Sequence, residues 1–290
     1  MKLLSAAPAS TQHFLLIMDK PIIRVFPRRT NATPVDELVR VRKIPSLFEP
    51  EVAEIHISVT FTWDMKWAEW AATQWEQVAP VKIGGPACNE KSGDFVAGMY
   101  MKQGYTITSR GCPNNCWFCS VPKREGQLRE LPIVDGWIIQ DDNLLACSEK
   151  HINEVFTMLK RQPKRPQFTG GLEAKLLTQN MAFRLKELKP ESLFFAYDTK
   201  SDYEPLVQAG AYLQNAGFSK TNHTLRCYVL CGYKGDTFDK AEKRMRDTWR
   251  AGFMPFSMLY KDDKGIVNAE WKKFNRGWAN PFIVASKLTQ

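Results

Sequence analysis

The sequence predicts an α/β protein whose main part is an open, partial (βα)6 barrel of the TIM type. Two observations support this fold class. From residue 105 onward, six short apolar segments alternate with four amphipathic segments, a pattern typical of parallel strands covered by helices. The chain has 290 residues, 44% of them hydrophobic, which is enough for one large domain with a buried core. Six strands are too few to close an eight-stranded barrel.

The first 100 residues are expected to form an irregular arm followed by a β–α–β segment. Five prolines between residues 21 and 50 interrupt any long element, and only a short strand over residues 22–26 fits there. The segment after the arm is clearer, because alternating β-branched residues give way to tryptophans at helical spacing. The expected elements are a strand over 54–62, a helix over 64–78 and a strand over 81–83.

Residues 101–262 are expected to form the core of repeated β–α units, and residues 263–290 a C-terminal tail that packs on it. Apolar, β-branched segments predict the strands, and apolar residues spaced by three or four predict the helices between them. The predicted strands are 105–109, 136–139, 167–169, 192–197, 225–230 and 255–259. The predicted helices are 149–161, 178–188, 202–216 and 237–251.

Three of the seven cysteines, Cys112, Cys116 and Cys119, lie within eight residues, directly after the first strand of these repeats. Parallel α/β folds build their sites at the carboxyl ends of strands. Three thiolates on one loop can bind three irons of a [4Fe–4S] cluster and leave the fourth iron open to a chelating substrate. The alternative is a structural zinc loop, which needs a fourth ligand such as Cys147 or His151.

The spacing Cys-x3-Cys-x2-Cys, with an aromatic residue before the last cysteine, resembles the signature of the radical SAM superfamily. The resemblance covers about residues 105–260. It implies that Cys112, Cys116 and Cys119 hold a [4Fe–4S] cluster whose open iron binds S-adenosylmethionine. It also implies reductive cleavage of that cofactor to a 5′-deoxyadenosyl radical, which abstracts a hydrogen atom from a substrate. A reducing partner such as flavodoxin or ferredoxin would supply the electron.

The resemblance also implies contacts to the adenine of S-adenosylmethionine. Phe118, between the last two cysteines, is similar to the family's residue beside the adenine. Gly232 begins a glycine-containing turn, Gly232-Tyr233-Lys234-Gly235, that is similar to the family's turn near adenine after the fifth strand. We therefore expect both positions to bind the cofactor.

Four polar residues after strands are candidates for the remaining cofactor contacts. Asp142 and Asn143 stand where many members of the superfamily carry a Gly-Gly-Glu turn, so this sequence departs from the family pattern. Either side chain can still accept a hydrogen bond from the methionyl ammonium. Glu173 and Asp198 follow the third and fourth strands, and they are candidates for the ribose hydroxyls or the methionyl group. The alternative for both is a capping role in a turn or helix.

Residues 54–86 resemble the end of the N-terminal domain of cobalamin-dependent members of the superfamily. The Asp-x-His-x-x-Gly motif of that domain is absent, and His56 stands outside any such motif. The ~50 preceding residues are too few and too rich in proline for the missing strands. We therefore expect a truncated remnant without cobalamin, which packs against the barrel or frames the substrate.

The formal net charge of +9 favours anionic partners, so a nucleic-acid or nucleotide-derived substrate is preferred over a peptide. Trp271, Phe274 and Trp278 alternate with basic residues near the C-terminus, and this segment either stacks on bases or docks on the barrel, which is the preferred reading. The rival functional hypothesis is a non-enzymatic, metal-stabilised module that binds nucleic acid. An iron–sulfur electron carrier ranks last.

The expected location is the cytoplasm, with no membrane partner. No apolar run reaches the ~18 residues of a membrane span, and the N-terminal residues do not resemble an export signal. An odd number of cysteines is atypical of a disulfide framework and favours a reducing compartment.

Overall fold

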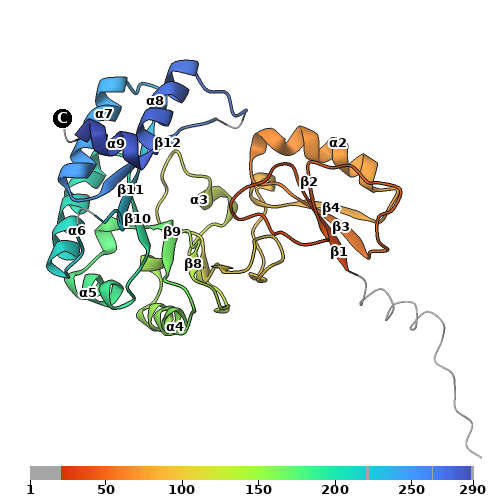
Figure 1. Cartoon of the computed structure of the whole chain (residues 1–290), viewed down its shortest axis with the longest axis horizontal. Coiled ribbons are helices and arrows are strands. Elements are labelled where there is room, and N and C mark those ends of the chain that lie inside the picture. The colour runs from red at the N-terminus through yellow and green to blue at the C-terminus, as the bar shows by residue number, and fades with distance from the viewer. Residues whose placement is uncertain (1–20, 220–221, 263, 289–290) are drawn as a thin grey trace, which may run out of the picture. The chain divides into compact units, whose positions relative to one another are not determined.

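The computed structural model describes residues 21–219, 222–262 and 264–288, and these form two compact units. The N-terminal unit comprises the described residues up to Glu90 together with Gly98–Lys102. The main unit comprises Lys91–Ala97 and the described residues from Gln103 onward. Each unit has its own sheet and its own apolar core (Figure 1).

The N-terminal unit contains a four-stranded parallel sheet in the order β2-β1-β3-β4. Its helix α2 buries Ala68, Ala71 and Trp75, and its strands contribute isoleucines and valines to the same core. The elements are β1 (Ile22–Phe26), β2 (Val39–Val41), β3 (Glu54–Ser58), α2 (Met65–Trp75) and β4 (Val81–Gly84).

The short strand expected over residues 22–26 is confirmed as β1, whereas the expectation that the rest of the arm is irregular is wrong for β2. Pro21 and Pro27 flank β1 without interrupting it, and four of its five residues are buried, as in a central parallel strand. β2 is only three residues long, which is too short to give a periodic signal. The residues before Glu54, which were expected to be too few for the missing strands, therefore supply β1 and β2, two of the four strands of this sheet.

The main unit contains a six-stranded, all-parallel sheet in which each strand lies next to the one before it in the chain. This confirms the α/β class. The strands are β5 (Tyr105–Thr106), β8 (Ile138–Ile139), β9 (Gln167–Leu172), β10 (Ser192–Tyr197), β11 (Leu225–Cys231) and β12 (Met254–Leu259). The helices between them are α4 (Glu149–Lys160), α5 (Gln179–Glu187), α6 (Tyr203–Asn215) and α7 (Phe238–Arg250) (Figure 1).

One face of this sheet and the inner faces of its helices form the core of the main unit. Leu193, Phe195, Cys227 and Val229 belong to it and are fully buried. Since these residues alternate along β10 and β11, the other side chains of the two strands point to the opposite face. There the ring of Phe194 stacks on that of Tyr228 at 4.4 Å. Cys227 and Cys231 are buried residues of β11, in agreement with a packing role.

β9 carries a bulge that changes its register against β10. Phe168 lies opposite Leu193 and Leu172 lies opposite Phe195, so three residues of β9 face the single residue Phe194. Gly171, inside the bulge, has φ +104°, a backbone conformation that favours glycine. The bulge ends just before Glu173, and it therefore sets the position of that side chain.

The C-terminal segment forms two helices, α8 (Ala269–Ala279) and α9 (Pro281–Leu288). Trp278 of α8 is 1% exposed, and the ring of Trp271 lies 4.4 Å from that of Phe238 in α7. Phe274 also contacts Phe238. The aromatic face of this segment therefore packs on the main unit, as preferred above. Among the described residues, no helix combines the length and hydrophobicity that a membrane span requires.

Candidate functional site

The three clustered cysteines lie on one loop between β6 (Ser109–Arg110) and α3 (Val121–Arg124), and each is half-buried. Burial raises the pKa of the Cys116 thiol, and the neighbouring Cys119 and Cys112 raise it further. Burial also raises the pKa of Cys119. Thiols in such surroundings stay protonated at neutral pH, so they release protons only when a metal binds.

A zinc ion and an iron–sulfur cluster would make different demands on these three thiols. In the described part of the chain, no three His, Cys, Asp or Glu side chains converge closely enough to hold one metal ion. Zinc needs four ligands around one point, whereas each thiolate of a cubane cluster binds a different iron. The two candidate fourth zinc ligands interact elsewhere: Cys147 with Ser109, and His151 with Glu130 at 3.9 Å.

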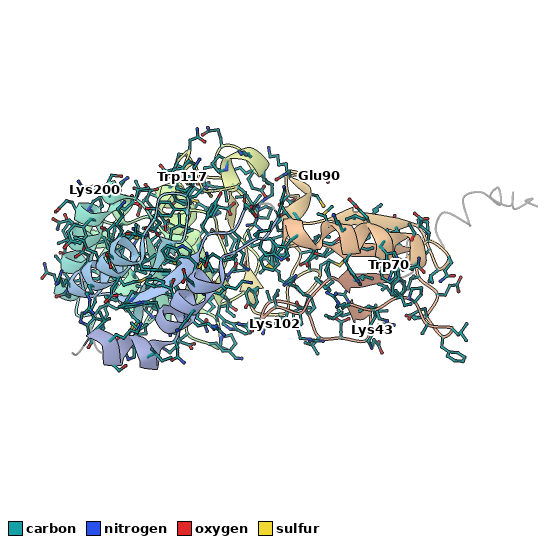
Figure 2. All side chains as sticks on the ribbon, turned by 90° about the horizontal axis from the view of Figure 1, so that it is seen from above. Lys43, Trp70, Glu90, Lys102, Trp117 and Lys200 are labelled. Carbon is teal, nitrogen blue, oxygen red and sulfur yellow. The ribbon has the colours of Figure 1, made fainter. Side chains whose placement is uncertain are left out.

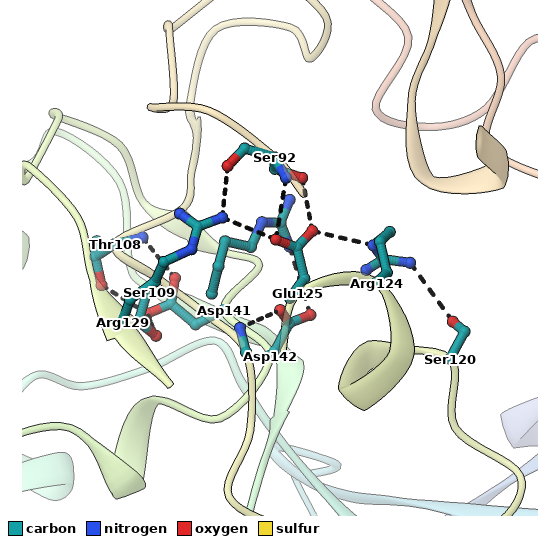
Figure 3. A network of polar contacts seen from close by, with 11 residues as sticks. Ser92, Thr108, Ser109, Ser120, Arg124, Glu125, Arg129, Asp141 and Asp142 are labelled. Carbon is teal, nitrogen blue, oxygen red and sulfur yellow. Dashed lines mark hydrogen bonds and ion pairs between the residues drawn. The ribbon is translucent and has the colours of Figure 1, made fainter. Parts of the chain in front are cut away.

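Gly111 and Asp142 fix the start of the cysteine loop (Figure 3). The amide of Gly111 donates to Oδ2 of Asp142 at 2.9 Å, and the amide of Cys112 donates to the carbonyl of Gly126 at 3.3 Å. Gly111 has φ +83°, and a Cβ there would lie 2.3 Å from the carbonyl oxygen of Gln127. Asp142 therefore anchors the loop backbone, a role that the sequence did not reveal.

Asn143 connects the cysteine loop with β9. Its Nδ2 donates to Oε2 of Glu173 at 2.6 Å and to Sγ of Cys112 at 3.5 Å. The side chain is buried, and Oδ1 has no hydrogen-bond partner within the described residues. An unsatisfied buried acceptor costs about 1–3 kcal/mol, so a donor from a bound ligand is expected there. The structure thus brings three of the predicted site residues into contact.

Asp141 braces the carboxyl end of β8 through hydrogen bonds to Thr108 and Ser109 (Figure 3). Its carboxylate accepts hydrogen bonds from the amide and hydroxyl of Thr108, both at 2.6 Å, and from the hydroxyl of Ser109 at 2.8 Å. Burial raises its pKa. A Cβ on Gly170 would lie 2.0 Å from the Asp141 carbonyl oxygen, so the β9 bulge packs directly on this turn. Sequence reasoning singled out Asp142 and did not predict this bracing role of Asp141.

Glu125 organises the loop that follows α3, and sequence reasoning missed it. Its carboxylate accepts hydrogen bonds from the hydroxyl of Ser92 at 2.6 Å, from Arg124 at 3.0 Å and from Arg129 at 2.8 Å (Figure 3). Burial alone would raise the pKa of Glu125, but these hydrogen bonds outweigh it and lower the pKa to about 2. The two arginine partners lie one and four positions from Glu125 in the chain. Such a short spacing of charged residues is common on exposed helices and loops, so it does not mark a buried carboxylate in the sequence.

The other predicted cofactor-binding residues lie at the carboxyl ends of later strands or on the cysteine loop. Oδ1 of Asp198 accepts a hydrogen bond from the amide of Leu230 at 3.1 Å, and burial raises its pKa to about 7. The amide of Gly232 donates to Asp236 at 2.9 Å. Phe118 is half-buried on the cysteine loop. Within the described ranges, no hydrogen bond joins these residues to Asn143.

Comparison with known proteins gave no relative: no protein-family model matches the chain, and no curated protein is similar to it. The fold and site define an α/β protein with a three-cysteine loop at the carboxyl edge of a parallel sheet. The assignment of an activity therefore depends on the chemistry of that loop and its neighbours.

Proposed function

We propose that this protein is a radical SAM enzyme in which Cys112, Cys116 and Cys119 hold a [4Fe–4S] cluster at the mouth of an open (βα)6 barrel. The contact of Asn143 with both Cys112 and Glu173 carries the proposal. Asn143 lies 31 positions after Cys112 and 30 positions before Glu173 in the chain, and the resemblance to the superfamily singled out all three residues. When bound, the cluster would supply the electron that splits S-adenosylmethionine into methionine and a 5′-deoxyadenosyl radical.

The residues around the loop hold and orient the cofactor. Oδ1 of Asn143 would accept a hydrogen bond from the methionyl ammonium, and Glu173 fixes the amide orientation by accepting from Nδ2. Asp142 keeps the loop in place through Gly111. Asp198 accepts from the ribose hydroxyls.

Phe118 and Gly232 border the adenine in this proposal. Gly232 has φ +76°, a conformation that favours glycine, and a Cβ there would meet the side chain of Leu259 at 2.8 Å. In this proposal the adenine lies against the backbone of the turn and the aromatic side chain of Phe118. The substrate is unidentified at this stage. Flavodoxin or ferredoxin serves as the reducing partner, and a reducing, cytoplasmic compartment suits the thiolate ligands.

The test is anaerobic reconstitution with iron and sulfide, followed by reduction with dithionite and addition of S-adenosylmethionine. We expect about four irons per chain and formation of 5′-deoxyadenosine. Cys116→Ala should abolish both, and Cys88→Ala, which removes a half-buried cysteine outside the loop, should abolish neither. One zinc per chain and no iron would support the rival binding module and contradict the enzyme.

A further inference from the structure

Three aromatic side chains form a group at the carboxyl edge of the main sheet, which we name the aromatic rim: Trp117, Tyr233 and Tyr260. The ring of Trp117 lies 5.4 Å from that of Tyr233 and 5.8 Å from that of Tyr260, at interplanar angles of 70° and 48°. Neither contact is a parallel stack, and Trp117 is 61% exposed (labelled in Figure 2). Much of the indole is therefore free to meet another ring.

The rim is held on a firm base. Tyr233 follows β11 and Tyr260 follows β12, and the amide of Tyr260 donates to the carbonyl of Cys231 at 2.8 Å, which ties the two loops together. The guanidinium of Arg244 lies 5.5 Å from the centre of the Tyr233 ring and pairs with the buried carboxylate of Asp236 at 2.8 Å. An aromatic platform fixed in this way loses little conformational entropy when a ligand binds.

Positive charge flanks the rim. Residues 117–124 and 232–235 contain three basic residues and no acidic one. Two of these, Lys123 and Lys234, are exposed and form no ion pair within the described residues. The loop after Tyr260 is balanced, since Lys261 and Lys264 stand beside Asp262 and Asp263. The rim thus combines exposed aromatic surface with free ammonium groups.

We propose that the aromatic rim binds single-stranded nucleic acid, with a base stacked on Trp117 and phosphates near Lys123 and Lys234. Stacking of unpaired bases on aromatic side chains beside basic residues is the usual way in which proteins hold such strands. Trp117 of the rim lies on the cysteine loop, and the rim lies where parallel sheets bind ligands. The role of the aromatic rim as a substrate-binding surface rests on the proposed function. It implies that the substrate of the enzyme is a nucleotide within a single-stranded nucleic acid.

The experiment measures the fluorescence anisotropy of labelled 15-nucleotide strands, oligo-U and oligo-dT, with the anaerobically reconstituted protein at several salt concentrations. We expect binding that weakens as salt rises. Trp117→Ala should weaken it at least about fivefold, the smallest loss typical of a stacked base. Trp70→Ala is the matched control, since Trp70 is 50% exposed on α2 of the N-terminal unit. Comparison of the two strands tells RNA from DNA.

A second pair of variants tests the charge and guards against a folding defect in Trp117→Ala. Lys234→Glu should weaken binding and reduce its salt dependence, whereas Lys66→Glu on α2 should leave both unchanged. Binding that is absent, independent of salt or equal in Trp117→Ala and wild type overturns the proposal. The proposal is also overturned if Trp117→Ala loses only its reduction by flavodoxin and keeps strand binding. That result would assign the aromatic rim to an acidic redox partner.

The binding measurement needs no radical chemistry, so the two proposals fail separately. Formation of 5′-deoxyadenosine without strand binding overturns the substrate class and leaves the enzyme. Strand binding through Trp117 without iron or 5′-deoxyadenosine overturns the enzyme and retains the rim.

Discussion

Asn143 is a buried side chain that links the cysteine loop to the residue that follows β9. Its Nδ2 is occupied by Glu173 and Cys112, whereas its Oδ1 has no partner among the described residues. A carboxylate at this position could accept from an ammonium but could not donate to Glu173. Under the proposed function, a pair would replace the Gly-Gly-Glu turn of the superfamily: the amide of Asn143 would accept from the ammonium, and the carboxylate of Glu173 would orient the amide.

Replacement of Asn143 by alanine tests this pair. We expect Asn143→Ala to keep its iron and to bind S-adenosylmethionine about tenfold more weakly, because one hydrogen bond to a charged group is lost. Isothermal titration of the reconstituted protein measures the affinity. Asn115→Ala, at an exposed position of the same loop, is the control and should bind normally. Equal affinities of the two variants would contradict the role given to Asn143.

The raised pKa of Asp198 predicts that the stability of the folded protein depends on pH. Its pKa in the folded protein is about 7, above the ordinary value of 3.8, so the folded state holds its proton more firmly than the unfolded state. Stability contributed by this group is therefore complete below about pH 4 and is lost as pH rises toward 7. Asp198→Asn removes the titration while keeping an acceptor for Leu230.

We expect metal-free Asp198→Asn to be more stable than wild type at pH 8, on the order of 1–4 kcal/mol, and the difference to shrink toward pH 5. Urea denaturation at a series of pH values measures it. Asp135→Asn, at a side chain 74% exposed, should show no such trend. A constant difference across the series would rule out the buried, protonated carboxyl.

At the scale of elements, the cysteine loop is shaped more by its glycine and acidic anchors than by the cysteines. Apolar periodicity predicted the four helices between the strands, and the strands from residue 192 onward, to within one residue, whereas the strand expected over 105–109 ends at Thr106 and that over 167–169 continues to Leu172. The roles of Asp141, Asp142 and Glu125 did not follow, because each depends on partners about 30 residues away in the chain. β2 was missed because three residues carry no period.

Gly111 tests the anchoring of the loop. Gly111→Ala places a methyl group against a backbone carbonyl at a positive φ, which costs at least about 1–2 kcal/mol. We expect a lower melting temperature, by about 2–4 °C per kcal/mol, and reduced iron per chain after reconstitution. Gly93→Ala, where a Cβ meets no atom within 4 Å, should preserve both. Full iron loading in Gly111→Ala would show that the loop tolerates a shifted start.

At the scale of the whole molecule, the chain contains two cores that share no buried residue. From residue 21 onward, the N-terminal unit has four parallel strands and the helix α2, which is more than the truncated remnant expected from its sequence. The expectation that this unit packs against the barrel or frames the substrate stays a prediction. The separate cores imply that damage to one should remain local.

A matched pair of core substitutions tests this separation. Ile57→Ala in the N-terminal unit and Val229→Ala in the main unit each remove a fully buried side chain, at a cost of about 1–5 kcal/mol. We expect hydrogen exchange to rise around β3 in the first variant and around β10 and β11 in the second. Iron loading should fall only in the second. Equal rises in both units after Ile57→Ala would show that the two cores unfold together.

The bulge in β9 bears on how such a site arises in evolution. Three residues stand where a regular strand has one, so the excess is two residues. An insertion of two codons leaves every later side chain on its original face of the sheet, whereas an insertion of one reverses them all. An excess of two residues thus moves Glu173 along the edge of the sheet and keeps Leu172 in the core. A variant with two residues deleted from the bulge should retain the sheet and lack the contact between Glu173 and Asn143.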